Sequence, residues 1–253
     1  MIAGGIDLGS RFVKIVINNR GENHYLIFDT IEFYKEYVKK IDNKMAIDIS
    51  NFPFRIDKLF ATGYGRNLLN FSNVQVISEI KAHYMGAMEQ TGENNFVLVD
   101  IGGQDSKVIF VRDGYIEDFV MNDKCAASSG RFIETVSSIL KVPIGDMGKF
   151  VNDPVKLSST CSVFAESEII GKIAEGYPFE EIMAGVNESI AKRILPHLKK
   201  YTKHKIFAGG GVAMLEGVIF FMEKHLNKKI QTLPNPHFNG AIGCMAYASR
   251  KID

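Results

Sequence analysis

Two stretches of the chain, residues 2–17 and 96–111, share one pattern of apolar and polar positions. In each, an apolar run ends in an aspartate, passes through a glycine-bearing turn and continues as a second apolar run. Short apolar runs bounded by turn residues are typical of buried strands. Each stretch is therefore expected to form a β-hairpin or the start of a β-meander.

The two stretches also match position by position, as an internal repeat. The aligned pairs are Asp7 with Asp100, Gly9 with Gly102, Lys14 with Lys107, and Gly21 with Gly114. A repeat of this kind indicates two lobes of related topology. Lys14 and Lys107 fall in the middle of strands, where an exposed flank is the expected environment for a lysine.

The rest of the chain alternates between strand-like and helix-like segments. The further expected strands are 58–62, 74–77, 205–208 and one near residue 230. The expected helices are 34–45, 79–90, 126–140, 162–175, 179–200, one from about 213, and 240–250. Strands that alternate with helices predict an α/β fold.

Size and charge narrow the functional classes. The chain has 253 residues, 46% of them hydrophobic, which suits one large domain or two lobes. Its net charge of +1 provides no long-range field for nucleic acid or a membrane surface. No apolar run approaches the roughly 20 residues of a membrane span. The N-terminus lacks the pattern of a secretory signal, so a cytoplasmic protein is expected.

The repeated turns carry the chemistry of a phosphate site. Asp7 and Asp100 each end a strand, and the glycines after them allow backbone N–H groups to approach phosphate oxygens. The carboxylates themselves can hold Mg²⁺, directly or through water. A third glycine turn, Gly209–Gly211, offers a surface without side chains for a nucleoside. One such turn is usually only a turn, but two in register and a late glycine triplet favour nucleotide binding.

Three cysteines, Cys125, Cys161 and Cys244, are too few and odd in number for a disulfide framework. Cys125 and Cys161 each stand just ahead of a predicted helix, where the helix dipole favours a thiolate or an anionic cluster. A two-fold dimer would double this pair to four thiolates, enough for a [4Fe–4S] cluster or for zinc. From the spacing alone, two small buried residues are the favoured explanation.

Three motifs resemble those of one superfamily of ATPases. Residues 5–10 (GIDLGS) are similar to the first phosphate motif of the actin, heat-shock-cognate ATPase and sugar-kinase superfamily. Residues 100–105 (DIGGQD) are similar to its second, and residues 206–213 (IFAGGGVA) to its adenosine motif. The resemblance implies two ribonuclease-H-like lobes with a nucleotide cleft between them. The first lobe would be 1–95, completed by a C-terminal helix at about 238–253, and the second would be 96–237, with the cluster-binding helices.

Four further runs resemble a single family more closely. They are residues 62–66 (TGYGR), 78–87 (SEIKAHYMGA), 122–131 (NDKCAASSGR) and 159–168 (STCSVFAESE). They are similar to the ATPase activator, or component A, of 2-hydroxyacyl-CoA dehydratases, which is related to the ATPase subunits of benzoyl-CoA reductase. The match extends from Gly5 to about Ala248, and sugar kinases and actins lack the two cysteine runs.

This resemblance implies a function and a set of site residues. ATP and Mg²⁺ would bind between the lobes, and Cys125 and Cys161 of each subunit would ligate one oxygen-sensitive [4Fe–4S] cluster in a homodimer. Electrons would pass from a ferredoxin or flavodoxin to a dehydratase or related reductase. Cys244 is expected only to pack. The residues on the ATP motifs are Asp7, Asp100 and Gln104 as catalytic residues, with Gly9, Ser10, Gly102, Gly103, Gly209, Gly210 and Gly211 as nucleotide-binding residues.

Two departures and two alternatives remain open at this point. Leu215 stands where the family usually has asparagine, and His237 where it often has glutamine; both bear on nucleoside contacts. His83 lies in a family run on a predicted helix, where a structural role is as compatible as a functional one. The alternative functions are a small-molecule kinase of the same fold and a non-redox ATP-binding regulator with zinc.

Overall fold

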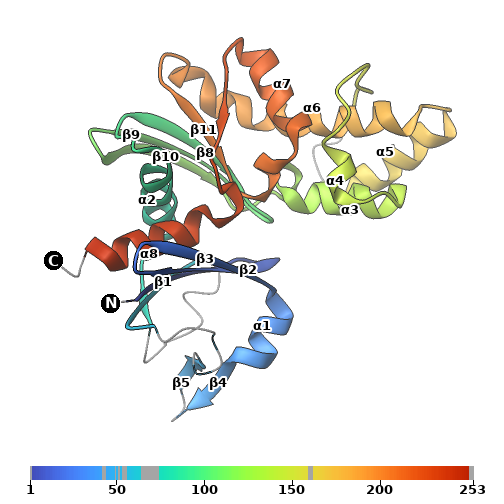
Figure 1. The fold of residues 1–253 in the computed structure, drawn as a ribbon. Coiled ribbons are helices and arrows are strands. Elements are labelled where there is room, and N and C mark those ends of the chain that lie inside the picture. The colour runs from blue at the N-terminus through green and yellow to red at the C-terminus, as the bar shows by residue number, and fades with distance from the viewer. Residues whose placement is uncertain are drawn as a thin grey trace. The chain divides into compact units, whose positions relative to one another are not determined.

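The computed structural model describes residues 2–41, 44–48, 50, 52, 56–63, 74–158 and 162–250. The chain forms two compact units. Unit 1 comprises Met1–Glu93 and His237–Asp253, and unit 2 comprises Asn94–Pro236. Each is built on its own five-stranded sheet (Figure 1). One cluster of buried hydrophobic residues lies in unit 2 and two lie in unit 1.

Unit 1 is built on a five-stranded sheet with the order β3-β2-β1-β6-β7. β1 pairs antiparallel with β2 and parallel with β6, and β1 is buried along its whole length. The strands are β1 (Ala3–Leu8), β2 (Phe12–Asn19), β3 (Glu22–Asp29), β6 (Lys58–Thr62) and β7 (Gln75–Val76). The other elements are α1 (Thr30–Tyr37), β4 (Val38–Ile41), β5 (Lys44–Ile47), α2 (Glu79–Thr91) and α8 (Asn239–Arg250).

The last helix, α8, packs directly on β1 and α2, although it is far from both in the sequence. A Cβ atom on Gly243 would lie 1.8 Å from the carbonyl oxygen of Ala82, and one on Gly5 would lie 2.1 Å from that of Ala241. Backbones this close leave no room for a side chain, so glycine is required at both positions. The small-residue start of α8 is therefore explained by its packing, and this packing completes unit 1.

Unit 2 repeats the sheet of unit 1, with the order β10-β9-β8-β11-β12. β8 pairs antiparallel with β9 and parallel with β11, as β1 does with β2 and β6. The strands are β8 (Phe96–Ile101), β9 (Ser106–Arg112), β10 (Tyr115–Asn122), β11 (Ile206–Gly209) and β12 (Gln231–Thr232). The predicted α/β class with two related sheet-based lobes is confirmed.

The helices of unit 2 follow β10 and β11. α3, α4 and α5 gather beyond one end of the sheet, and α6 runs back along it (Figure 1). They are α3 (Gly130–Leu140), α4 (Ile144–Met147), α5 (Ser162–Ala174), α6 (Phe179–Leu198) and α7 (Glu216–Leu226). Short 3₁₀ helices are η2 (Ala126–Ser128), η3 (Lys199–Tyr201), η4 (Gly211–Met214) and η5 (Pro236–Phe238), of which η5 crosses the unit boundary.

Three expected helices differ from the structure at their boundaries. The helix expected over 34–45 ends at Tyr37, and the antiparallel strands β4 (Val38–Ile41) and β5 (Lys44–Ile47) follow it. The helix expected from 126 begins as η2, is interrupted at Ser129 by extended backbone (φ −135°, ψ 174°), and continues as α3. The helix expected from about 213 begins at Glu216. In the last two cases a 3₁₀ turn precedes the α-helix.

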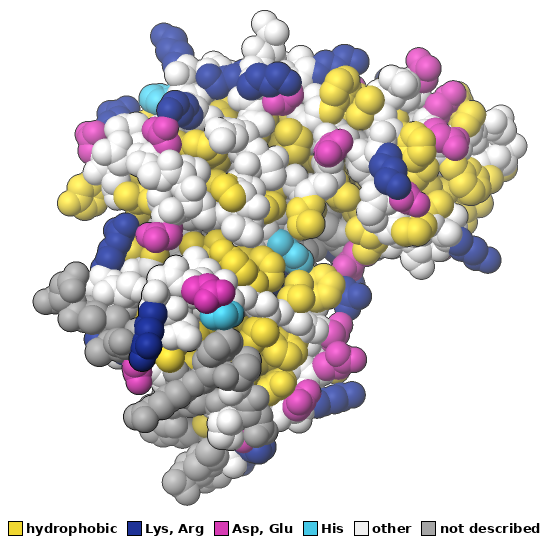
Figure 2. Space-filling model, in the orientation of Figure 1, with side chains coloured by type: hydrophobic (Ala, Val, Ile, Leu, Met, Phe, Trp, Pro, Cys, Tyr) yellow, Lys and Arg dark blue, Asp and Glu magenta, His cyan; other side chains and the backbone are white. Residues whose placement is uncertain are grey.

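Within the described ranges, no helix is long and apolar enough to cross a membrane. On the face shown in Figure 2, basic and acidic side chains are interspersed, which agrees with the net charge of +1.

Candidate functional site

The first predicted phosphate loop joins β1 to β2. Asp7 is 5% exposed, Gly9 is half-buried and Ser10 is exposed, so the loop backbone rises from a buried acid toward solvent. A Cβ atom on Gly9 would lie 2.6 Å from the carbonyl oxygen of Phe12 and 2.8 Å from Nζ of Lys14. The tight turn therefore requires glycine, and its backbone stays uncovered by a side chain.

Within unit 1, Asp7 lies near a lysine and near the start of helix α8. In the β1–β2 ladder it stands opposite Lys14, whose Nζ lies 3.1 Å from Oδ2 of Asp7. Gly63, with φ +97°, and Gly240, in the first turn of α8, both approach the same carboxylate. Positive charge and the helix N-terminus both favour the ionised form of Asp7. The carboxylate thus lies in a nearly closed position, beside Lys14 and the first turn of α8.

The second predicted loop joins β8 to β9 and has the same construction. Asp100 is 1% exposed, Gly102 and Gly103 are half-buried, and Gln104 is exposed. The amide of Gly102 donates to the carbonyl of Asp105 at 2.9 Å, which closes the turn. Asp100 stands opposite Lys107, as Asp7 stands opposite Lys14.

The expectation that both lysines are exposed flanks is wrong. The side chain of Lys107 is 1% exposed and that of Lys14 is 13% exposed. Nζ of Lys107 lies 2.7 Å from Oδ2 of Asp105 and 3.8 Å from Oδ1 of Asp100. A buried ammonium group is tolerated only with anionic partners, and these two carboxylates provide them. The signal for this pairing was present in the sequence, as the matched aspartate–lysine spacing of the repeat.

The glycine triplet 209–211 lies beside Asp100 in unit 2. Gly209 is the register partner of Asp100 across β11 and β8, and its Cβ atom would lie 2.8 Å from Oδ2 of Asp100. Gly210, with φ +81°, passes so close to Ile101 that a Cβ atom would lie 2.3 Å from the carbonyl oxygen of Ile101. Gly211 begins η4 and is half-buried. The structure thus brings the predicted second phosphate loop and the glycine triplet together.

The two departures from the family pattern, Leu215 and His237, both pack against other side chains of their own unit. Leu215 is 7% exposed and belongs to the main core of unit 2. The ring of His237 contacts that of Phe12 edge-on, with the centroids 5.6 Å apart, in unit 1.

Cys125 lies in a loop that Asn122 organises. Oδ1 of Asn122 accepts from the amide of Cys125 at 3.2 Å, and its Nδ2 donates to Oγ of Ser128 at 2.6 Å. The predicted position at the start of a long helix is wrong, because only the 3₁₀ helix η2 follows Cys125 and α3 begins at Gly130. The thiol is half-buried, and Cys161 lies outside the described residues.

Arg193 of α6 supplies the positive charge near Cys125. Burial lowers the pKa of the Arg193 guanidinium, while the nearby Cys125 and Glu168 act to raise it. The guanidinium carbon also lies 5.8 Å from the centre of the Phe132 ring. Glu168 in turn accepts from the amide and hydroxyl of Ser158, at 2.6 and 2.7 Å. The charge of Arg193 therefore interacts with both Cys125 and Glu168.

Cys244 is the packing residue that the sequence predicts. It is fully buried in α8, and burial raises the pKa of its thiol well above the usual value, with Asp7 adding to the effect. Among the described residues, no group of three or more His, Cys, Asp or Glu side chains is arranged to hold a metal.

The amino end of α3 lies between the second predicted phosphate loop and the Cys125 loop. The amides of Gly130 and Arg131 donate to the carbonyls of Gly102 and Gly103, at 2.9 and 2.8 Å. On the other side, Oγ of Ser128 lies 3.5 Å from Oγ of Ser106, at the start of β9. The first residues of α3 are therefore hydrogen-bonded to the second predicted loop, and Ser128, three positions after Cys125, lies close to Ser106.

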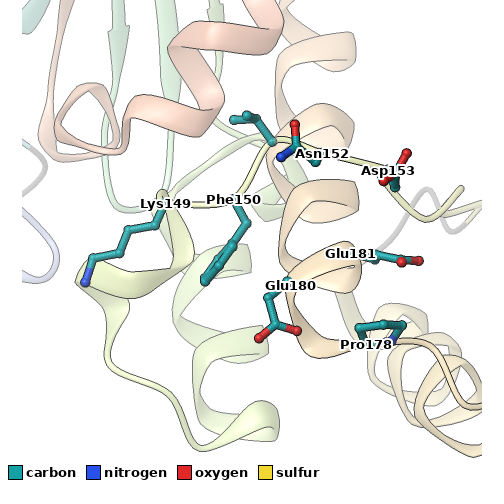
Figure 3. Close-up of a pocket in the computed structure, with 8 residues that line it drawn as sticks. Lys149, Phe150, Asn152, Asp153, Pro178, Glu180 and Glu181 are labelled. Carbon is teal, nitrogen blue, oxygen red and sulfur yellow. The ribbon is translucent and has the colours of Figure 1, made fainter.

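A pocket of about 350 Å³ lies elsewhere in unit 2, between the loop after α4 and the start of α6 (Figure 3). It is lined by Lys149, Phe150, Val151, Asn152, Asp153, Pro178, Glu180 and Glu181. None of these is a predicted site residue, and the lining has more acidic than basic side chains. The candidate site is therefore placed at the glycine loops and not at this pocket.

The two repeated sheets with their Asp–Gly loops define the class of the protein, which has the actin-like ATPase fold. The chain belongs to the BadF/BadG/BcrA/BcrD ATPase family, whose model matches residues 5–248.

Its relatives include activators of dehydratases. It is 41% identical over 195 residues to the (R)-2-hydroxyglutaryl-CoA dehydratase activating ATPase of Acidaminococcus fermentans, covering 76% of this chain and 75% of that one. It is 39% identical to the activator of lactoyl-CoA dehydratase of Anaerotignum propionicum, covering 96% of each. The solved activator of the 2-hydroxyisocaproyl-CoA dehydratase of Clostridium difficile, with bound ADPNP, is similar with a TM-score of 0.84 and 30% identity, over 99% of this chain and 95% of that chain.

Proposed function

We propose that this protein is an ATP-hydrolysing iron–sulfur protein that activates a 2-hydroxyacyl-CoA dehydratase, or a related reductase, by ATP-driven one-electron transfer. The observation that carries the proposal is the direct hydrogen bonding between the second phosphate loop and α3, next to Cys125. These hydrogen bonds connect the proposed nucleotide loop to a helix that begins five residues after Cys125, the candidate redox ligand. The relatives named as dehydratase activators supply the class of acceptor.

At the nucleotide, the glycine loops would bind the phosphates through backbone amides. Asp7 and Asp100 fit Mg²⁺ because they are buried carboxylates at strand ends, next to loops open to solvent. When bound, Mg²⁺ neutralises charge on the phosphates. Gln104, exposed in the second loop, is proposed to orient the attacking water. Gly209, Gly210 and Gly211 would face the nucleoside.

At the redox site, Cys125 and Cys161 of two subunits would ligate one [4Fe–4S] cluster. Cys125 fits such a group because its thiol is half-buried and lies near the Arg193 guanidinium. A bound cluster supplies one-electron transfer, with a ferredoxin or flavodoxin as donor. Arg193 would offset the negative charge of the thiolate ligands, and Asn122 would fix the loop that presents Cys125.

Coupling requires that the two nucleotide states differ in the position of the phosphate loop. Because Gly102 and Gly103 accept the first amides of α3, a changed loop would move that helix start. The Ser106–Ser128 contact would carry the same shift to the residues that follow Cys125. By linkage, the redox state would then alter ATP affinity to the same extent.

Anaerobic purification tests the proposal most directly. The expected result is brown protein with four irons and four sulfides per dimer, which hydrolyses Mg²⁺-ATP. Supplied with a reduced ferredoxin or flavodoxin, it should reduce an acceptor dehydratase only with ATP present. Colourless protein that contains zinc would replace the proposal with a regulator. ATP-dependent phosphorylation of a metabolite, without iron, would replace it with a kinase.

A further inference from the structure

A buried polar cluster lies in unit 1, behind the first phosphate loop and outside the glycine motifs. It joins His83 and Gln90 of α2 to Asn239, the first residue of α8. His83 is 6% exposed and Asn239 is fully buried. Buried polar groups are costly unless they are hydrogen-bonded, so the arrangement of this cluster is informative.

The hydrogen bonds of Asn239 fix the direction of its side-chain amide. Its Nδ2 donates to the backbone carbonyl of His83 at 2.9 Å, and its Oδ1 accepts from Nε2 of Gln90 at 3.0 Å. A carbonyl oxygen only accepts, so the nitrogen of Asn239 must be the atom that faces His83. The helix α8 therefore presents an N–H donor to this histidine.

The same donor determines which ring nitrogen of His83 carries the proton. Nδ2 of Asn239 lies 3.4 Å from Nδ1 of His83. Facing a donor, Nδ1 acts as an acceptor, and the proton of the neutral ring is then on Nε2. His83 is thus set up as an N–H donor on the side of the ring away from Asn239.

Nε2 of His83 points to the region of Asp7. The position of Gly240 relates the two side chains. A Cβ atom on this residue would lie 3.2 Å from Nε2 of His83 and 3.1 Å from Oδ2 of Asp7. Both atoms border the same small space, which a side chain at 240 would fill. An N–H donor and a carboxylate there are complementary, and Lys14 reaches the same Oδ2 at 3.1 Å.

We infer that His83 is a positioning residue for Asp7, holding its carboxylate together with Lys14 in the orientation that serves Mg²⁺-ATP. The inference rests on the proposed function, in which Asp7 acts on Mg²⁺-ATP. Asn239 sets the tautomer of His83, and Gly240 leaves the space open. Partners of this kind, behind a metal-binding carboxylate, affect metal affinity and turnover without touching the nucleotide.

Two near-isosteric substitutions separate this role from simple helix packing. In His83→Gln the side-chain nitrogen can take the place of Nε2, whereas in His83→Asn it reaches only the place of Nδ1. We expect His83→Asn to lower kcat for ATP hydrolysis about 10- to 100-fold and to raise the Mg²⁺ concentration for half-maximal activity. His83→Gln should recover most of both losses. ATP binding measured without Mg²⁺ should stay unchanged in both variants.

The experiment uses the full-length, anaerobically purified protein, with His197→Asn in α6 as a control for histidine replacement. Melting temperatures are measured alongside. If His83 only packed the helices, the losses of ATPase activity would parallel the losses of melting temperature. Equal losses in His83→Asn and His83→Gln, or no loss in either, would overturn the inference while wild-type hydrolysis upholds the proposed function. A wild-type protein that neither binds nor hydrolyses ATP would overturn both.

Discussion

The backbone amide of Gly130 donates a hydrogen bond to the carbonyl oxygen of Gly102, at 2.9 Å. Gly102 belongs to the second Asp–Gly loop, and Gly130 is the first residue of α3, five positions after Cys125. A Cβ atom at 130 would lie 3.3 Å from that oxygen and 3.4 Å from Cα of Gly103. The contact is therefore close enough to respond to a single methyl group, which makes it a direct test of coupling.

Gly130→Ala should weaken the coupling of ATP hydrolysis to electron transfer. The added methyl group pushes the start of α3 away from the loop by a few tenths of an ångström, while the proposed phosphate-binding residues themselves are unchanged. We expect electrons transferred per ATP to fall about 2- to 30-fold, the range for substitutions that modulate coupling. ATP hydrolysis and iron content should remain near wild type.

The matched control is Gly145→Ala in α4, where a Cβ atom would meet no other atom within 4 Å. It makes the same chemical change in unit 2 at a site with open space. Equal electron yields per ATP in the two variants would show that the α3 contact does not carry the coupling.

Asp7→Asn and Asp100→Asn should each abolish most Mg²⁺-ATP hydrolysis. Asparagine keeps the shape of the side chain and removes the charge that would hold Mg²⁺, so kcat should fall by about 100-fold or more. Iron content should not change, because the cysteines are on other segments. Asp113→Asn, in the exposed β9–β10 turn, is the control. Hydrolysis at the wild-type rate in both variants would exclude these residues from the site.

Lys107→Met should destabilise unit 2 far more than an exposed lysine replacement does. The Lys107 side chain is 1% exposed and pairs with the carboxylates of Asp100 and Asp105. Without its charge, these two carboxylates would repel each other with no buried cation between them. Removing one partner of a buried ion pair lowers the free energy of unfolding by about 3–5 kcal/mol. Urea unfolding of the variant and the wild type measures this difference. Lys124→Met, whose side chain is 88% exposed, should change the free energy of unfolding by less than about 0.5 kcal/mol. A similar effect of both substitutions would contradict this account.

The sequence allowed the two related sheets and their loops to be predicted, because the repeat is local and each strand carries its own pattern. The pairing of Asp100 with Lys107 could also have been read from the repeat. The burial of Lys107 could not, since it depends on Asp105, and the aligned position in the first repeat is Phe12. The repeat alone therefore does not distinguish a buried lysine from an exposed one.

Other parts of the site depend on contacts between distant segments. His83 and Asn239 are 156 positions apart and meet only because α8 packs on α2. No local sequence pattern indicates this contact, so the role of His83 could not be predicted from the sequence of its own helix. The start of α3 differs from the expected residue 126 for a local reason: Ser128, Ser129 and Gly130 are turn and capping residues, and Ser129 is the N-cap of α3.

Cys125→Ser and Cys161→Ser should each remove the cluster from the whole dimer. In the proposed two-fold dimer every change occurs twice, so a single substitution removes two of the four proposed ligands, and the remaining two thiolates should not hold a [4Fe–4S] cluster. Each variant should be colourless and dimerise more weakly, yet bind ATP, because the glycine loops are intact. Cys244→Ala is the control, since this thiol is fully buried in α8; it should keep its iron and its activity. Iron analysis, visible spectra and sedimentation give the readouts. Four irons per dimer in either serine variant, or loss of iron in Cys244→Ala, would show that the ligand pair is wrongly assigned.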